Sequence, residues 1–406
     1  VINTCKELKQ AYPEYEFVPI YWMASEDHDF EEISYFRLNG KKLVWDTEQS
    51  GAVGRMDPSA LLEMAKSLPK GAEFFEEAYS QPTLADAARS YVNHLFGEHG
   101  LVVIDADNRE LKQSLIPVIE DDLFTHSTEK LVNKTSSELE NAGCKAQVNA
   151  RQVNFFFLKD EVRERIERIE EGFEVVDTDM RFSDAEMKQL ITEHPEQFSP
   201  NVLLRPLYQE MILPNLSYVG GPSELLYWLQ FKSVFDRFQV SFPILQPRNF
   251  GLIVPKSAET KWEKTGLTSK ELFLDGEKAF TQWVEKNSNN GLSFSEDLES
   301  LKGLETELKK KAEKVDPTLV QHIESLHATF SKRLEKAEKK LVRSEKRKHQ
   351  EKRQQIESVK DTLFPGGTLQ ERKDNFLNFY LKDSTFTKSL LDTFEPFEFK
   401  MYLIPE

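Results

Sequence analysis

The first half of the chain alternates short apolar runs with longer stretches of helical periodicity. Residues 17–23 (FVPIYWM) form an aromatic-rich apolar run bounded by charge, which is typical of a buried strand. Residues 82–97 follow a helical pattern, and residues 101–105 (LVVID) form a second apolar run that ends in an acid. Residues 42–46 are a further strand candidate. This alternation predicts an α/β fold with a doubly wound parallel sheet.

The middle of the chain predicts a smaller α+β piece, after which the α/β pattern returns. Residues 153–158 and 173–176 have strand character, and they flank a charged segment, residues 161–171, that we expect to be helical. This piece is therefore expected to be an insertion in the sheet-forming core. After it, helices are expected at 201–212 and 222–238, and strands at 216–219 and 241–245.

The last third of the chain has a near-heptad spacing of apolar residues. Residues 316–360 contain no Gly, and Pro317 follows Asp316 in the arrangement of a helix start. A shorter helical stretch, residues 295–314, precedes it, so the two are expected to form an antiparallel arm. Phe364-Pro-Gly-Gly367 ends the long helix. The predicted seam consists of Leu319, Ile323, Leu326, Phe330, Leu334, Ala337 and Leu341.

These patterns divide the chain into five parts. The prediction is a Rossmann-like α/β core in two pieces, an inserted α+β connecting subdomain, a long C-terminal helical coiled-coil arm, and a last segment that packs back on the core. The expected boundaries are 1–110 for the first core piece, 111–195 for the insertion, 196–260 for the second core piece, 261–363 for the arm and 364–406 for the last segment.

Composition and charge narrow the function classes. With 53 Lys and Arg against 69 Asp and Glu, the formal charge is −16, so the whole chain is a poor general nucleic-acid binder. Residues 331–353 differ, because eleven basic residues and four Glu give this stretch a charge of +7. No apolar run approaches the ~20 residues of a membrane span. Two cysteines, Cys5 and Cys144, exclude a disulfide framework and favour a cytoplasmic setting.

The densest polar cluster, residues 25–32 (SEDHDFEE), directly follows the first predicted strand. Ligands of open parallel sheets bind beyond the carboxyl ends of the strands. His28 is the side chain here whose unperturbed pKa lies near working pH, so it is a candidate general base, and the carboxylates are candidates to hold a cationic amine. The alternative is an acidic first turn of a helix, in which Asp and Glu favour the helix dipole. No second His or Cys lies at a ligand spacing, so no metal is predicted.

A second cluster, residues 218–224 (YVGGPSE), lies where a predicted strand turns into a helix. Free N–H groups at such a helix start favour a phosphate or carboxylate, and Gly220 and Gly221 would let it approach the backbone. The alternative is an ordinary strand-to-helix turn. The motif is neither a Walker A loop nor GxGxxG. Polar residues that we expect nearby are Arg205, Gln209, Asn215, Arg248 and Asn249.

At these two clusters the sequence resembles a known family. Residues 17–32 (FVPIYWMASEDHDFEE) and 201–230 (NVLLRPLYQEMILPNLSYVGGPSELLYWLQ) closely resemble the cysteine-adding enzymes of bacillithiol biosynthesis. The resemblance extends over essentially the whole chain, including LVVIDADN at residues 101–108 and the C-terminal arm. It implies a Rossmann-like core with connecting insertions and a coiled-coil arm used for dimerisation. Family members also carry an N-terminal part that is expected to be absent here, together with one wall of the site.

The resemblance further implies a ligase that joins L-cysteine to the glucosamine amino group of glucosaminyl malate, in the last step of bacillithiol synthesis. ATP or ADP is expected as the activating nucleotide on chemical grounds alone. Cysteine, glucosaminyl malate and a second copy of the chain are the expected partners, with no membrane and no nucleic acid. The predicted catalytic residues are His28, Asp27, Glu26 and Asp29. The predicted substrate-binding residues are Ser25, Trp22, Arg205, Gln209, Asn215, Gly220, Gly221, Ser223, Glu224 and Arg248.

Two other function classes compete with the ligase. A Rossmann-like core with a basic arm also suits a non-catalytic coiled-coil protein that binds nucleotide or RNA and assists assembly, with residues 331–353 on phosphate. The helical pattern of that stretch instead predicts that its charges are the solvated faces of a coiled coil. Another nucleotidyl-transfer enzyme on the same core is the second alternative.

Overall fold

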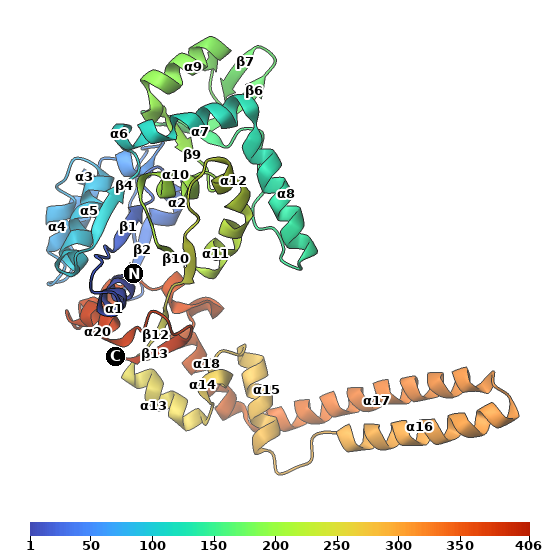
Figure 1. Ribbon diagram of the computed structural model, residues 1–406. Helices are drawn as coiled ribbons and strands as arrows, with labels where there is room; N and C mark the ends of the chain where they lie inside the picture. The colour runs from blue at the N-terminus through green and yellow to red at the C-terminus, as the bar shows by residue number, and fades with distance from the viewer. The chain divides into compact units, whose positions relative to one another are not determined.

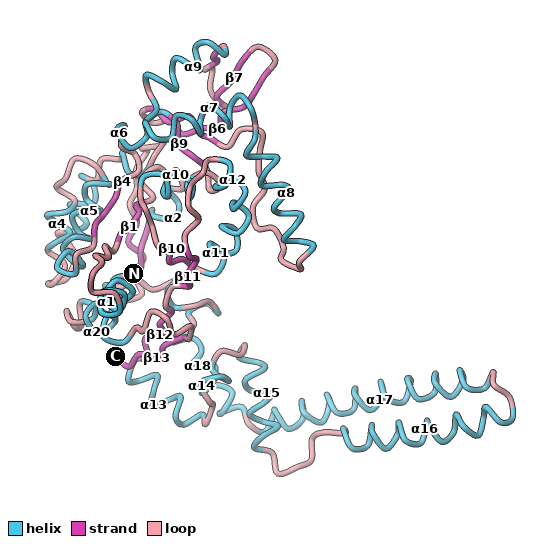
Figure 2. The backbone as a smooth tube through the Cα atoms, in the orientation of Figure 1, coloured by secondary structure: helices cyan, strands magenta, loops and turns pink.

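The computed structural model describes residues 1–406, and the chain forms two compact units. The first unit consists of residues 1–250 and 374–402, and the second of residues 251–373 and 403–406. Each unit has hydrophobic clusters of its own, so each is described by itself. Figures 1 and 2 show the course of the chain.

The first unit contains a parallel strand pair near its beginning. Strand β1 (Ile20–Met23) pairs with β4 (Val102–Asp105), so that Met23 lies opposite Asp105 at their carboxyl ends. Helix α5 (Leu84–Phe96) precedes β4 and begins at Thr83, whose hydroxyl accepts a hydrogen bond from the Asp86 N–H. The remaining elements of this stretch are α1 (Ile2–Ala11), α2 (Phe30–Ile33), β2 (Tyr35–Leu38), β3 (Lys41–Val44), α3 (Ser59–Ala65) and α4 (Phe74–Ala78).

A second parallel pair, β10 (Ser217–Gly220) and β11 (Ile244–Pro247), forms later in the same unit. Helices α11 (Pro222–Trp228) and α12 (Lys232–Arg237) lie between the two strands in sequence, and α10 (Arg205–Ile212) precedes β10. The predicted alternation of strands and helices with parallel pairing is thereby confirmed. Both pairs end in polar segments, which places candidate chemistry at strand ends.

Between these pairs the chain forms a five-stranded antiparallel sheet, in the order β8-β7-β6-β5-β9. The prediction of a helix at 161–171 is wrong, because this segment is strand β6. Its spacing of Val162, Ile166 and Ile169 imitates a helix, but pairing with β5 and β7 satisfies its backbone on both edges. The elements are α6 (Arg109–Lys112), α7 (Ile116–Glu120), α8 (Ser127–Asn141), β5 (Phe155–Lys159), β6 (Val162–Ile169), β7 (Gly172–Val175), β8 (Arg181–Phe182), α9 (Asp184–Glu193) and β9 (Phe198–Pro200).

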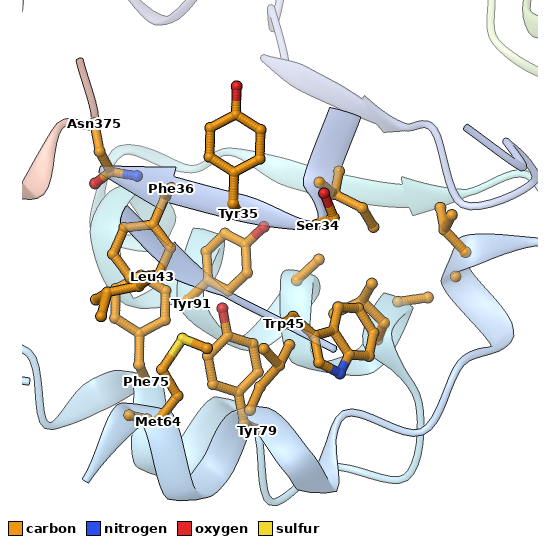
Figure 3. A pocket seen from close by; sticks show the side chains of 18 of the residues that line it. Ser34, Tyr35, Phe36, Leu43, Trp45, Met64, Phe75, Tyr79, Tyr91 and Asn375 are labelled. Atoms are coloured by element: carbon orange, nitrogen blue, oxygen red, sulfur yellow. The ribbon is translucent and has the colours of Figure 1, made fainter. Parts of the chain in front are cut away.

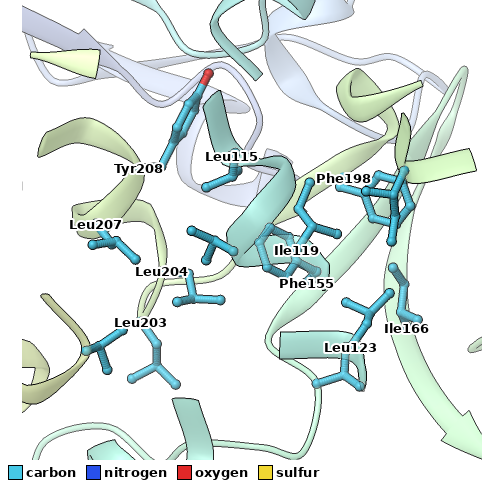
Figure 4. Packing of buried hydrophobic residues seen from close by; sticks show 14 of the residues in the cluster. Leu115, Ile119, Leu123, Phe155, Ile166, Phe198, Leu203, Leu204, Leu207 and Tyr208 are labelled. Carbon is cyan, nitrogen blue, oxygen red and sulfur yellow. The ribbon is translucent and has the colours of Figure 1, made fainter. Parts of the chain in front are cut away.

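The largest core cluster of the first unit packs this antiparallel sheet against the helices beside it (Figure 4). Phe155 of β5 and Phe198 of β9 meet Ile119 of α7, and the cluster continues through Leu204 and Tyr208. All of these side chains are buried. Since burying one large apolar side chain stabilises by about 1.5–3 kcal/mol, this cluster fixes α10 relative to the antiparallel sheet.

The second unit is helical apart from strand segments at its two ends. Helix α15 packs on α18 around Phe280, Val284 and Ile356, which are buried. Helices α16 and α17 form an antiparallel hairpin (Figure 2), which confirms the predicted arm. The elements are β12 (Phe250–Val254), α13 (Lys256–Thr265), α14 (Ser269–Leu272), α15 (Gly276–Asn287), α16 (Ser295–Val315), α17 (Leu319–Lys348), α18 (Gln350–Leu363) and β13 (Met401–Pro405).

Two details of the arm differ from the expectation. The long helix is interrupted at His349, which leaves helical geometry and contacts the Trp283 ring edge-on, so α17 and α18 are separate helices. The predicted seam also divides. Ile323 and Leu334 are half-buried, whereas Ala337 and the four large seam residues are exposed. These four are Leu319, Leu326, Phe330 and Leu341.

The last segment of the chain returns to the first unit. It contains α19 (Leu377–Tyr380) and α20 (Phe386–Thr393), and Asn378 donates a hydrogen bond to the Arg37 carbonyl at 3.1 Å. The side chain of Gln246 likewise donates to the Pro396 carbonyl at 2.9 Å. The five-part division of the chain stays a prediction.

Candidate functional site

The carboxyl ends of β1 and β4 carry the first group of candidate residues. Ser25 follows β1, and its hydroxyl donates to Asp105 Oδ1 at 2.5 Å, at the end of β4. The backbone N–H of Asp107 also donates to Asp105 Oδ1, at 3.0 Å. Ser25 is 5% exposed, and its carbonyl accepts from the Gly54 N–H. We call the polar residues gathered here the strand-end cluster. Its members are Ser25, Glu26, Asp27, His28, Arg55, Asp105, Asp107, Lys112 and Arg163.

Within this cluster Glu26 forms a buried ion pair with Lys112. Lys112 is fully buried at the end of α6, and its ammonium group contacts the Glu26 carboxylate and donates to the Phe198 carbonyl at 2.5 Å. Burial raises the pKa of Glu26, and the neighbouring Lys112 opposes that shift. The carboxylate of Glu26 is therefore committed to Lys112, which leaves its predicted catalytic role dependent on breaking that pair.

His28 lies on the exposed side of the cluster and contacts Arg163 of β6. The distance from Arg163 Nη1 to His28 Nδ1 is 2.5 Å. Because a guanidinium group only donates, Nδ1 must accept, and this assigns the His28 proton to Nε2. Arg163 is held in turn by Ser199 Oγ, 3.3 Å from its Nε, and by the Phe156 ring, whose centroid lies 4.1 Å from the guanidinium carbon. His28 thus presents an N–H donor at Nε2, and its predicted role as a general base stays a prediction.

The two aspartates beside His28 have different surroundings. Asp27 Oδ1 accepts hydrogen bonds from the backbone N–H groups of His28, at 2.7 Å, and Asp29, at 3.3 Å. This is the local turn bonding that the alternative interpretation of the acidic cluster expects of Asp. Asp29 is exposed just before α2, and its side chain makes no capping bond. The catalytic roles of Asp27 and Asp29 stay predictions.

The second group of candidates lies at the turn from β10 to α11. The Gly221 N–H donates to Glu224 Oε2 at 2.7 Å, and the Tyr218 hydroxyl donates to Glu224 Oε1 at 2.9 Å. A Cβ on Gly220 would lie 2.7 Å from the Tyr218 ring, so close packing explains this glycine. The expected anion cradle is thus filled by the carboxylate of Glu224. An anion could bind the Gly221 N–H only after Glu224 releases it.

The remaining predicted residues of this region surround a residue that the sequence did not single out, Glu210. The side chains of Gln209 and Asn215 both donate to Glu210 Oε1, at 2.9 and 2.8 Å. Arg205 Nη1 donates to Gln209 Oε1 at 3.2 Å. Burial raises the pKa of Glu210 to about 7. The structure therefore brings Arg205, Gln209 and Asn215 together around a buried carboxyl group.

Three further predicted residues take peripheral positions. Arg248 lies over the glycine turn, because its Nε is 3.6 Å from where a Gly221 Cβ would stand, and its backbone N–H donates to the Gly220 carbonyl at 2.9 Å. Ser223 is exposed on α11. Trp22 of β1 packs edge-on against Tyr208, with ring centroids 5.6 Å apart.

Helix α10 connects the two groups of candidates. Its residue Tyr208 is fully buried, and the Tyr208 hydroxyl donates to the Ala106 carbonyl, just after β4, at 2.9 Å. The next two residues along the helix, Gln209 and Glu210, contribute to the second group. One rigid element therefore sets where both groups lie.

A cavity of about 340 Å³ opens beside the strand-end cluster (Figure 3). Its walls are mainly apolar and aromatic, and they include Trp45, Tyr79 and Tyr91. Burial raises the pKa of Tyr79 to about 12, so this hydroxyl stays protonated. Ser25 is the one predicted site residue that lines the cavity. This cavity thus suits an apolar group, and apart from Ser25 it is not lined by the residues of the strand-end cluster.

The structure adds no metal site and no disulfide to these two groups. No group of three or more His, Cys, Asp or Glu side chains has the arrangement of a metal site. Cys5 and Cys144 are both free thiols. No helix combines the length and the apolar character needed to cross a membrane.

Comparison with known proteins identifies the family. Residues 1–249 match the family model described as "Bacillithiol biosynthesis BshC, N-terminal Rossmann-like domain", and residues 251–406 match "Bacillithiol biosynthesis BshC, C-terminal coiled-coil domain". The chain belongs to the BshC family. The resemblance stated from the sequence is thereby confirmed, and so is the fold class of a Rossmann-like domain with a helical coiled-coil domain.

Relatives in the BshC family match over most of the chain. A protein of Flavobacterium psychrophilum is 41% identical over 392 residues, which cover 94% of this chain and 73% of the relative. One from Cytophaga hutchinsonii is 38% identical over 403 residues, covering 99% and 77%. One from Christiangramia forsetii is 39% identical over 413 residues, covering 98% and 77%. Each of these relatives carries the name "Putative cysteine ligase BshC".

Sequence reasoning missed several residues of this BshC chain that shape the site. Lys112 and Arg163 lie 86 and 135 residues from the side chains they contact, and Arg163 belonged to a segment predicted as helix. Arg55 forms a two-pronged ion pair with Asp107, at 2.6 and 2.8 Å. The LVVIDADN motif contains the acids at the end of β4, and it was the sequence feature from which Asp105 and Asp107 could have been predicted as site residues.

We expect Lys112→Met to destabilise the protein by about 3–5 kcal/mol, because Glu26 would be left as a buried charge without a partner. The loss should be largest at pH 8 and shrink at pH 5. Burial already raises the pKa of Glu26, and removing Lys112 takes away the opposing influence, so acid restores a neutral side chain. Urea unfolding at both pH values measures this.

Two controls make the Lys112 prediction specific. Lys66→Met removes an exposed lysine that pairs with Glu63, and it should have no measurable effect. The double variant Lys112→Met with Glu26→Gln should recover part of the lost stability, because no charge stays buried. An equal loss at pH 5 and pH 8 would contradict the ion-pair explanation.

Proposed function

We propose that the protein is a cysteine ligase of bacillithiol biosynthesis. In this proposal it forms the amide bond between the carboxyl group of L-cysteine and the glucosamine amino group of glucosaminyl malate, in the last step of the pathway. The observation that carries the proposal is the match of both BshC domains over residues 1–249 and 251–406. The printed names of relatives that are 38–41% identical support it.

The chemistry of this reaction makes two demands on the protein. The amino group must lose its proton before it attacks, and the malate part brings two carboxylates that need cationic partners. Arg205 and Arg248 both lie near the β10–α11 turn and are suited to carboxylates. The strand-end cluster offers an N–H donor at Nε2 of His28. We therefore propose that malate binds near the turn.

Activation of the cysteine carboxyl group by ATP stays a proposal on chemical grounds. A carboxylate is a poor acyl donor, so an acyl phosphate or acyl adenylate is the expected intermediate class. The chain contains no Walker loop, and the N–H of Gly221 is already bonded to Glu224. These residues do not fit a nucleotide phosphate as they stand, so no nucleotide site is derived from them.

We also propose that the protein acts in the cytoplasm as a homodimer that forms through its arm. The two free thiols support a reducing compartment. Four exposed apolar residues support the dimer, since a stripe of this kind along a helix favours a second apolar surface. Within the hairpin itself, Lys309 pairs with Glu324 at 2.6 Å and His327 with Glu305 at 3.1 Å, so charged side chains there already have partners.

Thiol profiling of a strain that lacks this gene tests the proposed function. The deletion should abolish bacillithiol and accumulate glucosaminyl malate, and expression of the intact chain should reverse both effects. Mass spectrometry after thiol labelling quantifies the two compounds. Unchanged bacillithiol in the deletion strain would end the ligase proposal.

Variants of His28 in the same strain distinguish a hydrogen-bond donor from a base. We expect His28→Ala to lower bacillithiol about tenfold, since one lost hydrogen bond of ~1.4 kcal/mol changes a rate by that factor. His28→Gln keeps an N–H donor and should retain most of the product. If both variants lost it equally, His28 would be acting through its ring basicity. Asp236→Asn, at an exposed ion pair on α12, is the control.

The arm prediction is tested by oligomeric state. Replacing Leu326 and Phe330 together with Glu places two charges in the exposed stripe, where they are 57% and 51% exposed in the single chain. The fold of each chain should persist, because neither side chain is buried, but the dimer should dissociate. Light scattering at several protein concentrations measures the mass. A wild-type chain that stays monomeric at high micromolar concentration would contradict the proposal.

A further inference from the structure

Glu210 occupies an unusual position for a carboxylate. It lies in the last turn of α10, is 8% exposed and has no ion-pair partner. A buried charge without a partner is costly, and folded proteins keep one mainly where it serves a function. Stability alone therefore does not explain why a carboxylate is buried at this position.

The hydrogen bonds of Glu210 leave one of its oxygens available. Both amide donors, from Gln209 and Asn215, go to Oε1. Oε2 accepts no hydrogen bond from the protein. The carboxyl group is therefore fixed in orientation by one oxygen while the other can take a proton.

Two other buried carboxylates of the same unit, Glu26 and Asp122, and the half-buried Glu224 are occupied differently. Glu26 contacts the ammonium group of Lys112. Asp122 accepts from the backbone and side chain of Asn154, one bond on each oxygen. Glu224 has one donor on each oxygen, from Gly221 and Tyr218. Glu210 differs from Glu26 because it has no ion-pair partner, and from Asp122 and Glu224 because one of its oxygens has no donor.

The surroundings of Glu210 also suit proton transfer at neutral pH. Burial raises its pKa to about 7, while the two amides and Arg205 act in the opposite direction. Arg205 is the charged residue that influences it, and Tyr218 and Tyr227, which also lie near Arg205, stay neutral because burial raises their pKa values. A base whose pKa lies near the working pH is ionised in a substantial fraction of molecules, and it still binds a proton strongly enough to take one from the substrate.

We propose that Glu210 is the group that takes the proton from the ammonium group of the amino-sugar substrate, with Gln209 and Asn215 positioning its carboxylate. This inference rests on the proposed function. Oε2 accepts one proton from the R–NH₃⁺ group, which leaves R–NH₂ with a free electron pair. That nitrogen attacks the acyl carbon of an activated cysteine, of the acyl phosphate or acyl adenylate class. The C–N bond forms, and the bond between the acyl carbon and the phosphate oxygen breaks. The second proton of the ammonium group leaves with the phosphate-containing product.

Glu210→Gln is the decisive variant, because Gln keeps an acceptor for both amides but cannot take the proton. We expect it to lower bacillithiol in the complemented deletion strain by ~10²–10⁴-fold, the range of a lost general base. Glu193→Gln removes an exposed carboxylate at the end of α9 and should leave the product unchanged. Near-wild-type product from Glu210→Gln would overturn the inference while leaving the ligase proposal intact.

A binding measurement separates this inference from the ligase proposal. Calorimetry of glucosaminyl malate with the purified full chain should show that wild-type affinity falls as pH drops from 8 to 6, because the ammonium group needs ionised Glu210. Glu210→Gln should bind more weakly at pH 8 and lose that pH dependence. The same pH dependence in both proteins would overturn the role of Glu210, even if the thiol profiles confirm the ligase.

The thermal stability of Glu210→Gln shows whether the variant folds and whether Glu210 titrates as described. A folded-state pKa above the usual value means that wild-type stability falls as pH rises from about 4.5 through 7. The melting temperature of the variant should therefore exceed that of the wild type at pH 8.5, and the difference should diminish toward pH 5. A variant that melts lower at both pH values would show a structural role and overturn the proposal.

Discussion

The fully buried ammonium group of Lys112 is the interaction on which the first unit depends. It joins Glu26, just after β1, to the carbonyl of Phe198 in β9, and so it connects the parallel strand ends to the antiparallel sheet. Both side chains are buried, so separating the two parts would leave an unpaired charge inside the protein. Arg163 makes a second connection of the same kind, through Ser199 and His28.

Those connections hold the antiparallel sheet in place. Helix α10 packs on the core of that sheet and is therefore held in a fixed position. Leu204 and Tyr208 are fully buried in that core, and the Tyr208 hydroxyl reaches back to the end of β4. The helix then carries Gln209 and Glu210 toward Asn215 and the β10–α11 turn. Groups that are distant in sequence thus obtain a defined spacing through packing, which is what a two-substrate reaction requires.

The elements that depend on local sequence pattern were predicted from the sequence. The prediction was wrong where contacts between residues far apart in the chain determine the structure. The strands β1 and β4 and the α16–α17 hairpin follow from apolar runs and spacing, and they were predicted. Strand β6 was predicted as a helix, because Val162, Ile166 and Ile169 fit a helical face and only pairing with two neighbours selects the strand. Arg163, which lies in this strand, was therefore not predicted as a site residue, since its partner His28 lies 135 residues away in the chain.

Glu26 and Glu210 show why burial, which no pattern in one sequence displays, separates a structural carboxylate from a reactive one. Both are less than 10% exposed, and burial raises the pKa of each. Glu26 lies against an ammonium group, so its charge is compensated and its proton affinity is used to hold the fold. Glu210 has only amide donors on one oxygen, so its charge is tolerated rather than neutralised. A carboxylate in that condition gains free energy by taking a proton from a substrate, which is the property a base needs.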